Sequence, residues 1–116
     1  METYNFPDII RGDTFKTKEF EILKNSVALD LTDYEIKIQI RLGDKRGRVF
    51  KSFIIGDGIT MIDAAAGQFN WDAFLMDVTT PGKYFYDVEF TDVNGNVNTY
   101  VGGTIQVIDD VTRIEP

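Results

Sequence analysis

The feature that most constrains the fold of this chain is an alternation of apolar and polar residues with a period of two. Over residues 34–42, Tyr, Ile and Leu occupy every second position, and charged or amide residues lie between them. The same alternation recurs over residues 84–90 and 97–107, and a shorter version covers residues 67–71. Because successive side chains of a strand point to opposite faces, this pattern predicts half-buried antiparallel strands.

One hairpin is predicted with a defined turn. Asn94-Gly95 lies between the alternating segments 84–90 and 97–107. Asn and Gly both tolerate a positive φ, so the pair predicts a type I′ turn. The outward face of this hairpin is then expected to carry Phe85 and Tyr100.

Further turn signals divide the rest of the chain into short segments. Strands are expected over residues 15–23 and 49–55, and the only helical candidate is residues 72–78. Loops rich in Gly, Pro, Asn and charged residues punctuate these segments, at residues 24–26, 43–47, 56–58 and 80–82.

The segment Gly82-Lys83-Tyr84-Phe85-Tyr86 adds a more specific signal. It resembles the Gly-x-Tyr-x-Cys run of immunoglobulin-like domains, in which the Tyr hydroxyl bonds to the backbone of the preceding corner. Tyr84 takes the place of that tyrosine, and Tyr86 takes the place of the cysteine. We therefore predict an all-β fold, an immunoglobulin-like antiparallel β-sandwich of about seven or eight strands. One domain is expected over residues 1–116, with an exit tail at about 109–116.

Composition excludes several kinds of chemistry. The chain has no Cys and no His, which removes disulfides, zinc–thiolate sites and Ser-His or Cys-His catalytic pairs. No catalytic motif is present, so we expect a protein that is not an enzyme and needs no cofactor. The net charge of −7 argues against nucleic-acid binding. No apolar stretch approaches the roughly 20 residues that span a bilayer, and residues 1–6 do not resemble a signal peptide.

Two short motifs each have an ordinary explanation as well as a functional one. Arg11-Gly12-Asp13 is the tripeptide that integrins read, and it is also a common turn sequence. The segment 92–96 contains Asp and Asn as calcium loops do, but Gly95 is fourth rather than sixth, which favours the hairpin. A loose calcium site that adds Asp57, Asp109 and Asp110 stays open as an alternative.

The remaining candidates form a predicted interaction surface. Trp71 falls on a buried row, so a core role is favoured over a sugar-stacking one. Phe85 and Tyr100 fall on the opposite faces and are the aromatic candidates for contact with a partner. The loop at residues 43–47 and its flank hold the only concentration of basic residues: Lys45, Arg46 and Arg48. These three cations suit an acidic patch on a neighbouring protein.

The order of these segments is similar to a known family. The chain opens with Ile-Arg-Gly-Asp-Thr-Phe, continues through Leu29-Asp30-Leu31-Thr32 and Gly67-Gln68-Phe69, and closes with Gly102-Gly103-Thr104-Ile105 and Asp109-Asp110-Val111-Thr112-Arg113. It resembles small phage and prophage proteins of the tail or baseplate, and the N-terminal β-sandwich domain of siphophage baseplate upper proteins. Those proteins continue into a stalk or fibre, which this sequence lacks.

The resemblance implies a non-enzymatic structural role. We expect an interaction module of a phage or prophage particle that self-associates or docks on other tail or baseplate proteins. It would be made in the host cytoplasm and located in the virion, with no nucleic-acid or membrane partner. The alternative is a carbohydrate-binding or adhesin-like module for host recognition.

Overall fold

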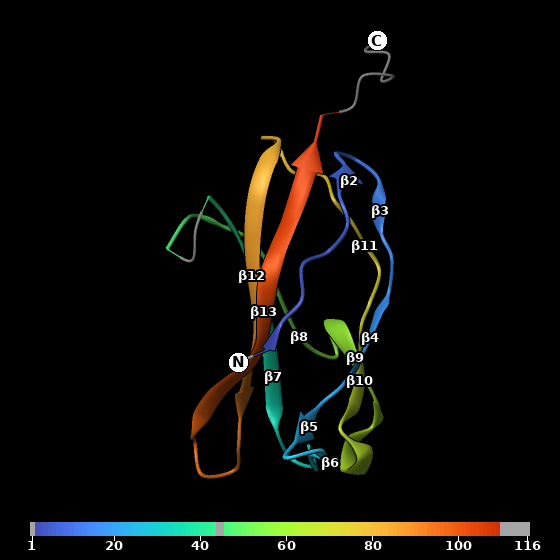
Figure 1. The fold of residues 1–116 in the computed structure, drawn as a ribbon, viewed down its shortest axis with the longest axis vertical. Coiled ribbons are helices and arrows are strands. Elements are labelled where there is room, and N and C mark those ends of the chain that lie inside the picture. Colours follow the sequence, from blue (N-terminus) through green and yellow to red (C-terminus); the bar gives the residue numbers. More distant parts are fainter. Residues whose placement is uncertain (1, 44–45, 110–116) are drawn as a thin grey trace.

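Strands make up most of this structure. The computed structural model describes residues 2–43 and 46–109, and it contains thirteen strands and one short 3₁₀ helix, η1 (Ala64–Ala66) (Figure 1). Seven strands have four or more residues: β4 (Lys18–Glu21), β7 (Glu35–Leu42), β8 (Val49–Ile55), β9 (Gly58–Asp63), β10 (Gln68–Trp71), β12 (Gly82–Thr91) and β13 (Val97–Ile108). Six have two residues: β1 (Glu2–Thr3), β2 (Ile9–Ile10), β3 (Thr14–Phe15), β5 (Leu23–Lys24), β6 (Val27–Ala28) and β11 (Phe74–Leu75).

The all-β prediction is therefore confirmed, and the predicted strand count was too low. The alternating segments became β7, β10, β12 and β13, and the segment 49–55 became β8. The undercount has a physical cause, because two-residue strands are too short to show a period.

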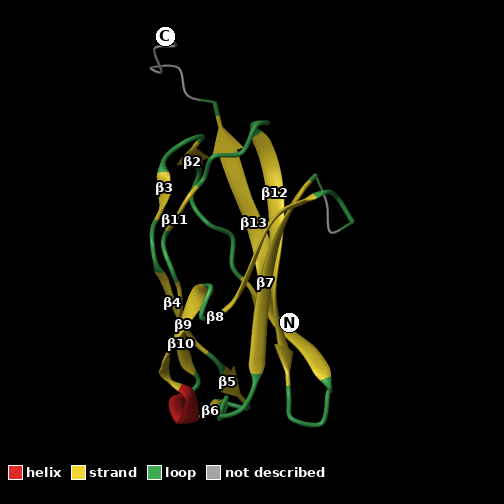
Figure 2. Ribbon diagram, turned by 180° about the vertical axis from the view of Figure 1, so that it is seen from behind, coloured by secondary structure: helices red, strands yellow, loops and turns green. Residues whose placement is uncertain are grey.

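Nine of the strands form one mixed sheet that curls around the core. Their order is β1-β13-β12-β7-β8-β9-β10-β4, and β2 also pairs with β13. Most neighbours are antiparallel, but β1 and β2 run parallel to β13, and β8 runs parallel to β9. The sheet predicted to be purely antiparallel is thus mixed. Figure 2 shows β12, β13 and β7 facing β4, β9 and β10 across the interior.

A tight corner between β8 and β9 makes this curl. The Ile54 and Asp57 backbones bond reciprocally, at 3.0 and 2.9 Å, around a turn that contains Gly56. The chain then continues as β9, which pairs with β8 only at its first two residues, Gly58 and Ile59. The chain crosses at this corner from one face of the core to the other.

The segment predicted as one strand over residues 15–23 is divided in two. Phe15 pairs with Phe74 of β11, whereas Lys18 pairs with Trp71 of β10. The partner ribbon is interrupted at Asp72 and Ala73, where the Ala73 N–H donates to the Thr17 hydroxyl at 3.1 Å. β3 and β4 are therefore two parts of one extended path.

The helix predicted at residues 72–78 is wrong. This segment is extended, with β11 paired to β3 and the Met76 N–H donating to the Asp13 carbonyl at 2.9 Å. Met76 and Val78 are buried, whereas Leu75 and Asp77 between and beside them are exposed. This alternation has the period of a strand, and it explains why the segment does not coil.

The predicted hairpin forms, but its turn type differs. Asn94 does not have a positive φ; only Gly95 does, at 83°. The Gly95 N–H donates to the Asp92 carbonyl, and the Asp92 N–H donates to the Asn96 carbonyl, both at 3.0 Å. A type I turn followed by a left-handed glycine has this geometry. Two consecutive positive φ values, the mark of a type I′ turn, occur instead at Asn25 and Ser26 between β5 and β6.

The core is a single apolar cluster inside the curl. All twenty buried side chains that compose it are hydrophobic, with Trp71 at 0% exposure near its centre. The Trp71 ring packs against Phe15, Phe53 and Tyr86, with ring centroids 4.9–5.4 Å apart. The prediction that Trp71 is a core residue is confirmed.

Two tyrosines of β12 tie loops to this core. The Tyr84 hydroxyl donates to the Thr80 carbonyl at 2.6 Å, which is the corner bond predicted from the sequence. The Tyr86 hydroxyl donates to the Tyr4 carbonyl at 2.7 Å. Burial raises the pKa of both hydroxyls above the usual value for tyrosine.

Candidate interaction surface

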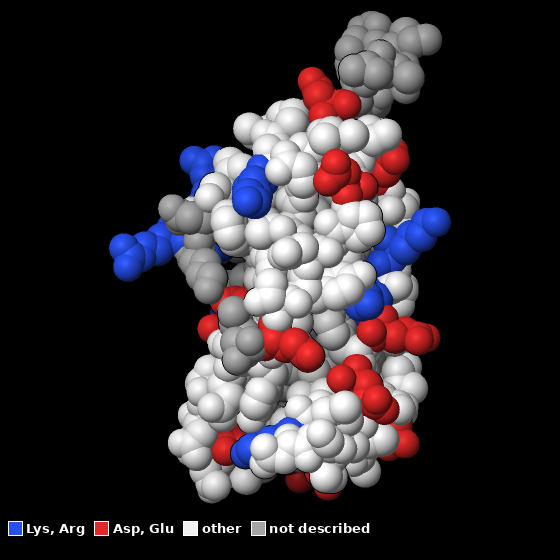
Figure 3. Space-filling view, viewed as in Figure 1, with Lys and Arg blue, Asp and Glu red and all other residues white. Residues whose placement is uncertain are grey.

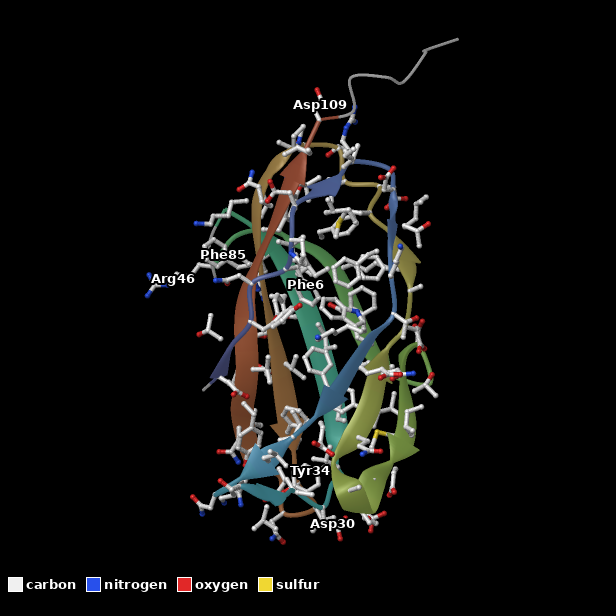
Figure 4. The ribbon with its side chains drawn as sticks, turned by 45° about the vertical axis from the view of Figure 1, so that its right-hand side comes forward. Phe6, Asp30, Tyr34, Arg46, Phe85 and Asp109 are labelled. Carbon is white, nitrogen blue, oxygen red and sulfur yellow. The ribbon has the colours of Figure 1, made fainter. Side chains whose placement is uncertain are left out.

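Phe85 lies on the outward face of β12, at the side where the β7–β8 hairpin projects (Figure 4). Its cross-strand neighbours are Arg41 on β7 and Thr104 on β13. The Lys83 ammonium lies 5.8 Å from the centre of the Phe85 ring, within cation–π range. The half-buried ring is thus flanked by two cationic side chains on a rigid sheet.

The base of the β7–β8 hairpin is fixed by Arg41. Its guanidinium donates to the Gly47 carbonyl at 2.8 Å and to the Gln39 side-chain oxygen at 3.0 Å. The Leu42 N–H also donates to the Arg48 carbonyl at 3.0 Å. These bonds hold the returning part of the loop next to the outward face of the sheet.

Two of the three basic loop residues can be placed. Arg46 and Arg48 are exposed on the hairpin, whereas Lys45 lies outside the described residues. Figure 3 shows Lys and Arg side chains standing out where this hairpin projects. We call Arg46 and Arg48 the basic hairpin.

Tyr100 lies elsewhere, and its predicted outward orientation is wrong. The register of β13 against β12 shifts here, so that Val88 pairs with Val101 and the next residue, Glu89, pairs with Thr99. Tyr100 is the extra residue of this bulge. Its half-buried ring packs against Phe90 with the centroids 5.3 Å apart. A bulge turns the following residues to the other face, which a strict period of two cannot anticipate.

A groove that the sequence did not indicate opens between the two ends of the curled sheet. We call it the seam groove. It consists of two adjoining hollows of about 280 and 530 Å³ between β1 and β4. Phe20, Ile22 and Val101 form its apolar floor, and Glu2, Glu19 and Glu21 stand exposed at its rim.

One side chain reaches across the upper part of this groove. The Lys18 ammonium lies 4.2 Å from the centre of the Tyr4 ring and 6.0 Å from that of Phe20. It connects the N-terminal segment to β4 without a backbone bond. The sequence could not reveal the groove, because it depends on which strand the N-terminal segment joins.

Asp92 serves its own turn. Its carboxylate accepts from the Asn94 and Asn96 N–H groups, both at 2.9 Å, and from the Asn96 side chain at 3.3 Å. These bonds, that of Asn96 above all, hold the pKa of Asp92 below its usual range. Within residues 2–43 and 46–109, no three His, Cys, Asp or Glu residues are grouped as metal ligands. Asp110 of the calcium alternative lies outside those ranges.

Arg11-Gly12-Asp13 forms a turn that is bonded to its surroundings. Arg11 pairs with Asp109 at 3.2 Å. The Gly12 N–H donates to the Met76 carbonyl at 2.8 Å, and the Met76 N–H donates to the Asp13 carbonyl at 2.9 Å. The tripeptide thus joins the start of β3 to β11 and to the end of β13.

Comparison with known proteins adds no relative. The chain matches no family model, and it matches no curated protein. Among the described residues, no helix has the length and apolar character needed to cross a membrane.

Proposed function

We propose that this protein is a non-enzymatic interaction module of a phage or prophage particle. It would act in the tail or baseplate, by self-association or by docking on other virion proteins. The observation that carries the interaction role is the outward face of β12 and β7, where Phe85 lies between Arg41 and Lys83 beside the basic hairpin. Aromatic and Arg side chains are the residues most often central to protein interfaces.

The rigidity of this face supports the proposal. Arg41 is fixed by two hydrogen bonds of its guanidinium, and Phe85 stands on a strand paired on both sides. A preorganised surface loses little conformational entropy on binding. In a chain of net charge −7, a local group of cations also favours an acidic partner surface over random association.

The pairing order supports the finer proposal of an immunoglobulin-like sandwich. Strands β13-β12-β7-β8 occur in the order G-F-C-C′, and β9-β10-β4 in the order D-E-B. The Tyr84–Thr80 bond is the corner expected of strand F. Two features depart from the pattern: the two groups of strands join at the β8–β9 corner, and Trp71 lies on β10 rather than on the C strand.

The assignment to a phage particle rests on the resemblance of the sequence, and it is tested by fractionation. A tagged chain is expressed during lytic growth of the phage that encodes it, and particles are separated on a density gradient. We expect the chain to sediment with particles or tails at a fixed ratio to a known tail protein. A chain that stays entirely in the unassembled fraction would overturn the proposal.

A matched pair of variants tests the surface. Phe85→Asp with Lys83→Glu changes the outward face of β12, and Lys24→Glu with Val27→Asp changes an equally exposed hairpin far from it along the chain. Only the first pair is expected to abolish incorporation. Incorporation that is unaffected by the first pair would mean that another surface makes the contact.

A further inference from the structure

β4 has one edge that no described strand covers. It pairs with β10 along Lys18–Glu21, and its other edge faces the seam groove. The N-terminal segment lies across that groove but bonds to β13: the Tyr4 N–H donates to Gly102 and the Phe6 N–H to Thr104, each at 2.9 Å. An uncovered edge is a template for one more strand.

The rim of the groove restricts which strand fits. Glu19 and Glu21 are exposed on the outward face of β4. If two copies of β4 paired with their faces aligned, these carboxylates would lie opposite one another or beside one another, which is destabilising. The edge therefore disfavours its own copy and favours a strand that carries cations on its outward positions.

The basic hairpin has that character. Arg46 and Arg48 are exposed, and Val49 next to them begins β8 with 36% of its surface exposed. Along residues 49–53, β8 pairs with β7 on one side, and β9 joins its other side only at Ile54 and Ile55. Figure 1 shows this hairpin standing away from the body of the molecule.

The charges of this chain are separated rather than paired. Arg11–Asp109 is the one salt bridge found among the described residues, although the sequence holds 12 basic and 19 acidic residues. Acidic side chains rim the seam groove, and basic ones gather at the hairpin. Two different complementary surfaces on one chain are the requirement for a head-to-tail contact.

We propose that the seam groove receives the basic hairpin of a second copy of this chain. Arg46 and Arg48 of one copy would lie against Glu19 and Glu21 of the next, with the start of β8 placed along the uncovered edge of β4. Each copy then offers one hairpin and one groove, so the contact repeats as a ring or a filament. This inference rests on the proposed function and deepens it by naming the partner.

The test uses charge reversal and native mass spectrometry at low ionic strength. One variant is Glu19→Lys with Glu21→Lys, and the other is Arg46→Glu with Arg48→Glu. The wild-type chain is expected to form oligomers that added salt dissociates, because exposed charges are screened. Each variant alone should associate about tenfold more weakly or less still. An equimolar mixture of the two should regain association, because every hairpin then has a groove of opposite charge.

Lys37→Glu with Glu35→Lys is the matched control, since both residues are exposed on β7 away from the groove and the hairpin. This control should associate as the wild type does, and all variants should keep its unfolding temperature. A monomeric wild type, or variants whose mixture fails to assemble, would overturn the inference. A monomeric chain that still sediments with particles would leave the proposed function intact, whereas a monomer absent from particles would remove both.

Discussion

The hydroxyl of Tyr86 donates a 2.7 Å hydrogen bond to the backbone carbonyl of Tyr4, eighty-two residues away in the chain. This bond fixes the N-terminal segment over the core, where the Phe6 ring packs edge-on against Tyr86 with centroids 5.2 Å apart. It occupies the position at which an immunoglobulin-like domain has its cysteine. One wall of the seam groove is thus held in place by a side chain of β12.

Removal of this hydroxyl should loosen the N-terminal segment. Tyr86→Phe leaves the packing of the ring in place but deprives the Tyr4 carbonyl of its donor. We expect a loss of about 1 kcal/mol in the free energy of unfolding, measured by urea denaturation. Tyr34→Phe is the control, because the described residues offer its hydroxyl no hydrogen bond. Equal losses in both variants would contradict the role of the Tyr86 bond.

Alkaline pH should destabilise the fold through the same residue. Burial raises the pKa of Tyr86 in the folded state, so the unfolded chain loses this proton first. The contribution to stability is complete below the unfolded pKa of about 10 and declines as the pH rises above it. Urea denaturation between neutral and alkaline pH should show a steeper decline for the wild type than for Tyr86→Phe. Parallel declines would exclude Tyr86 as the source.

A methyl group at Gly103 should displace the N-terminal segment. A Cβ at this position would overlap the Tyr4 carbonyl, and its other near neighbour is the Asn5 side chain at 3.1 Å. Gly103→Ala should therefore speed amide hydrogen exchange at Tyr4 and Phe6 and open the seam groove. Gly95→Ala is the control, because its positive φ costs about 1–2 kcal/mol while the space around it is open. Unchanged exchange at Tyr4 would contradict this account.

How far the sequence predicted this structure depends on the range of each interaction. The alternation over residues 34–42 and 84–90 became β7 and β12 because a strand paired on both sides obeys the period of two along its length. The corner bond of Tyr84 was also predictable, since its partner Thr80 is only four residues away.

The failures have the opposite cause. Tyr100 turned inward because one bulge shifts the pairing of β13, and a bulge leaves no mark on the period. The seam groove depends on the N-terminal segment joining β13 rather than β4, a choice made across about 100 residues of sequence. Of the predicted surface, Phe85, Arg46 and Arg48 lie on or beside the outward face of β12 and β7, and Tyr100 does not.

Acid should weaken the β12–β13 hairpin through Asp92. The hydrogen bonds from its own turn lower the pKa of this carboxyl in the folded state. Its contribution is present above the unfolded pKa of about 3.9 and is lost as the pH falls through the folded pKa. Asp92→Ala should lower stability at neutral pH and flatten the acid decline measured by thermal unfolding. Asp57→Ala, in an exposed turn, is the control, and an unchanged acid decline in Asp92→Ala would contradict the prediction.

The most direct test of the head-to-tail contact is disulfide trapping, which suits a chain without cysteine. Glu21→Cys and Arg48→Cys are prepared as single variants, mixed in equal amounts and oxidised under mild conditions. The proposed contact predicts that the mixed Glu21→Cys/Arg48→Cys disulfide forms faster than either homodimer, and faster than a mixture of Glu21→Cys with Lys37→Cys. Homodimers in excess, or equal rates in both mixtures, would contradict a contact between the seam groove and the basic hairpin.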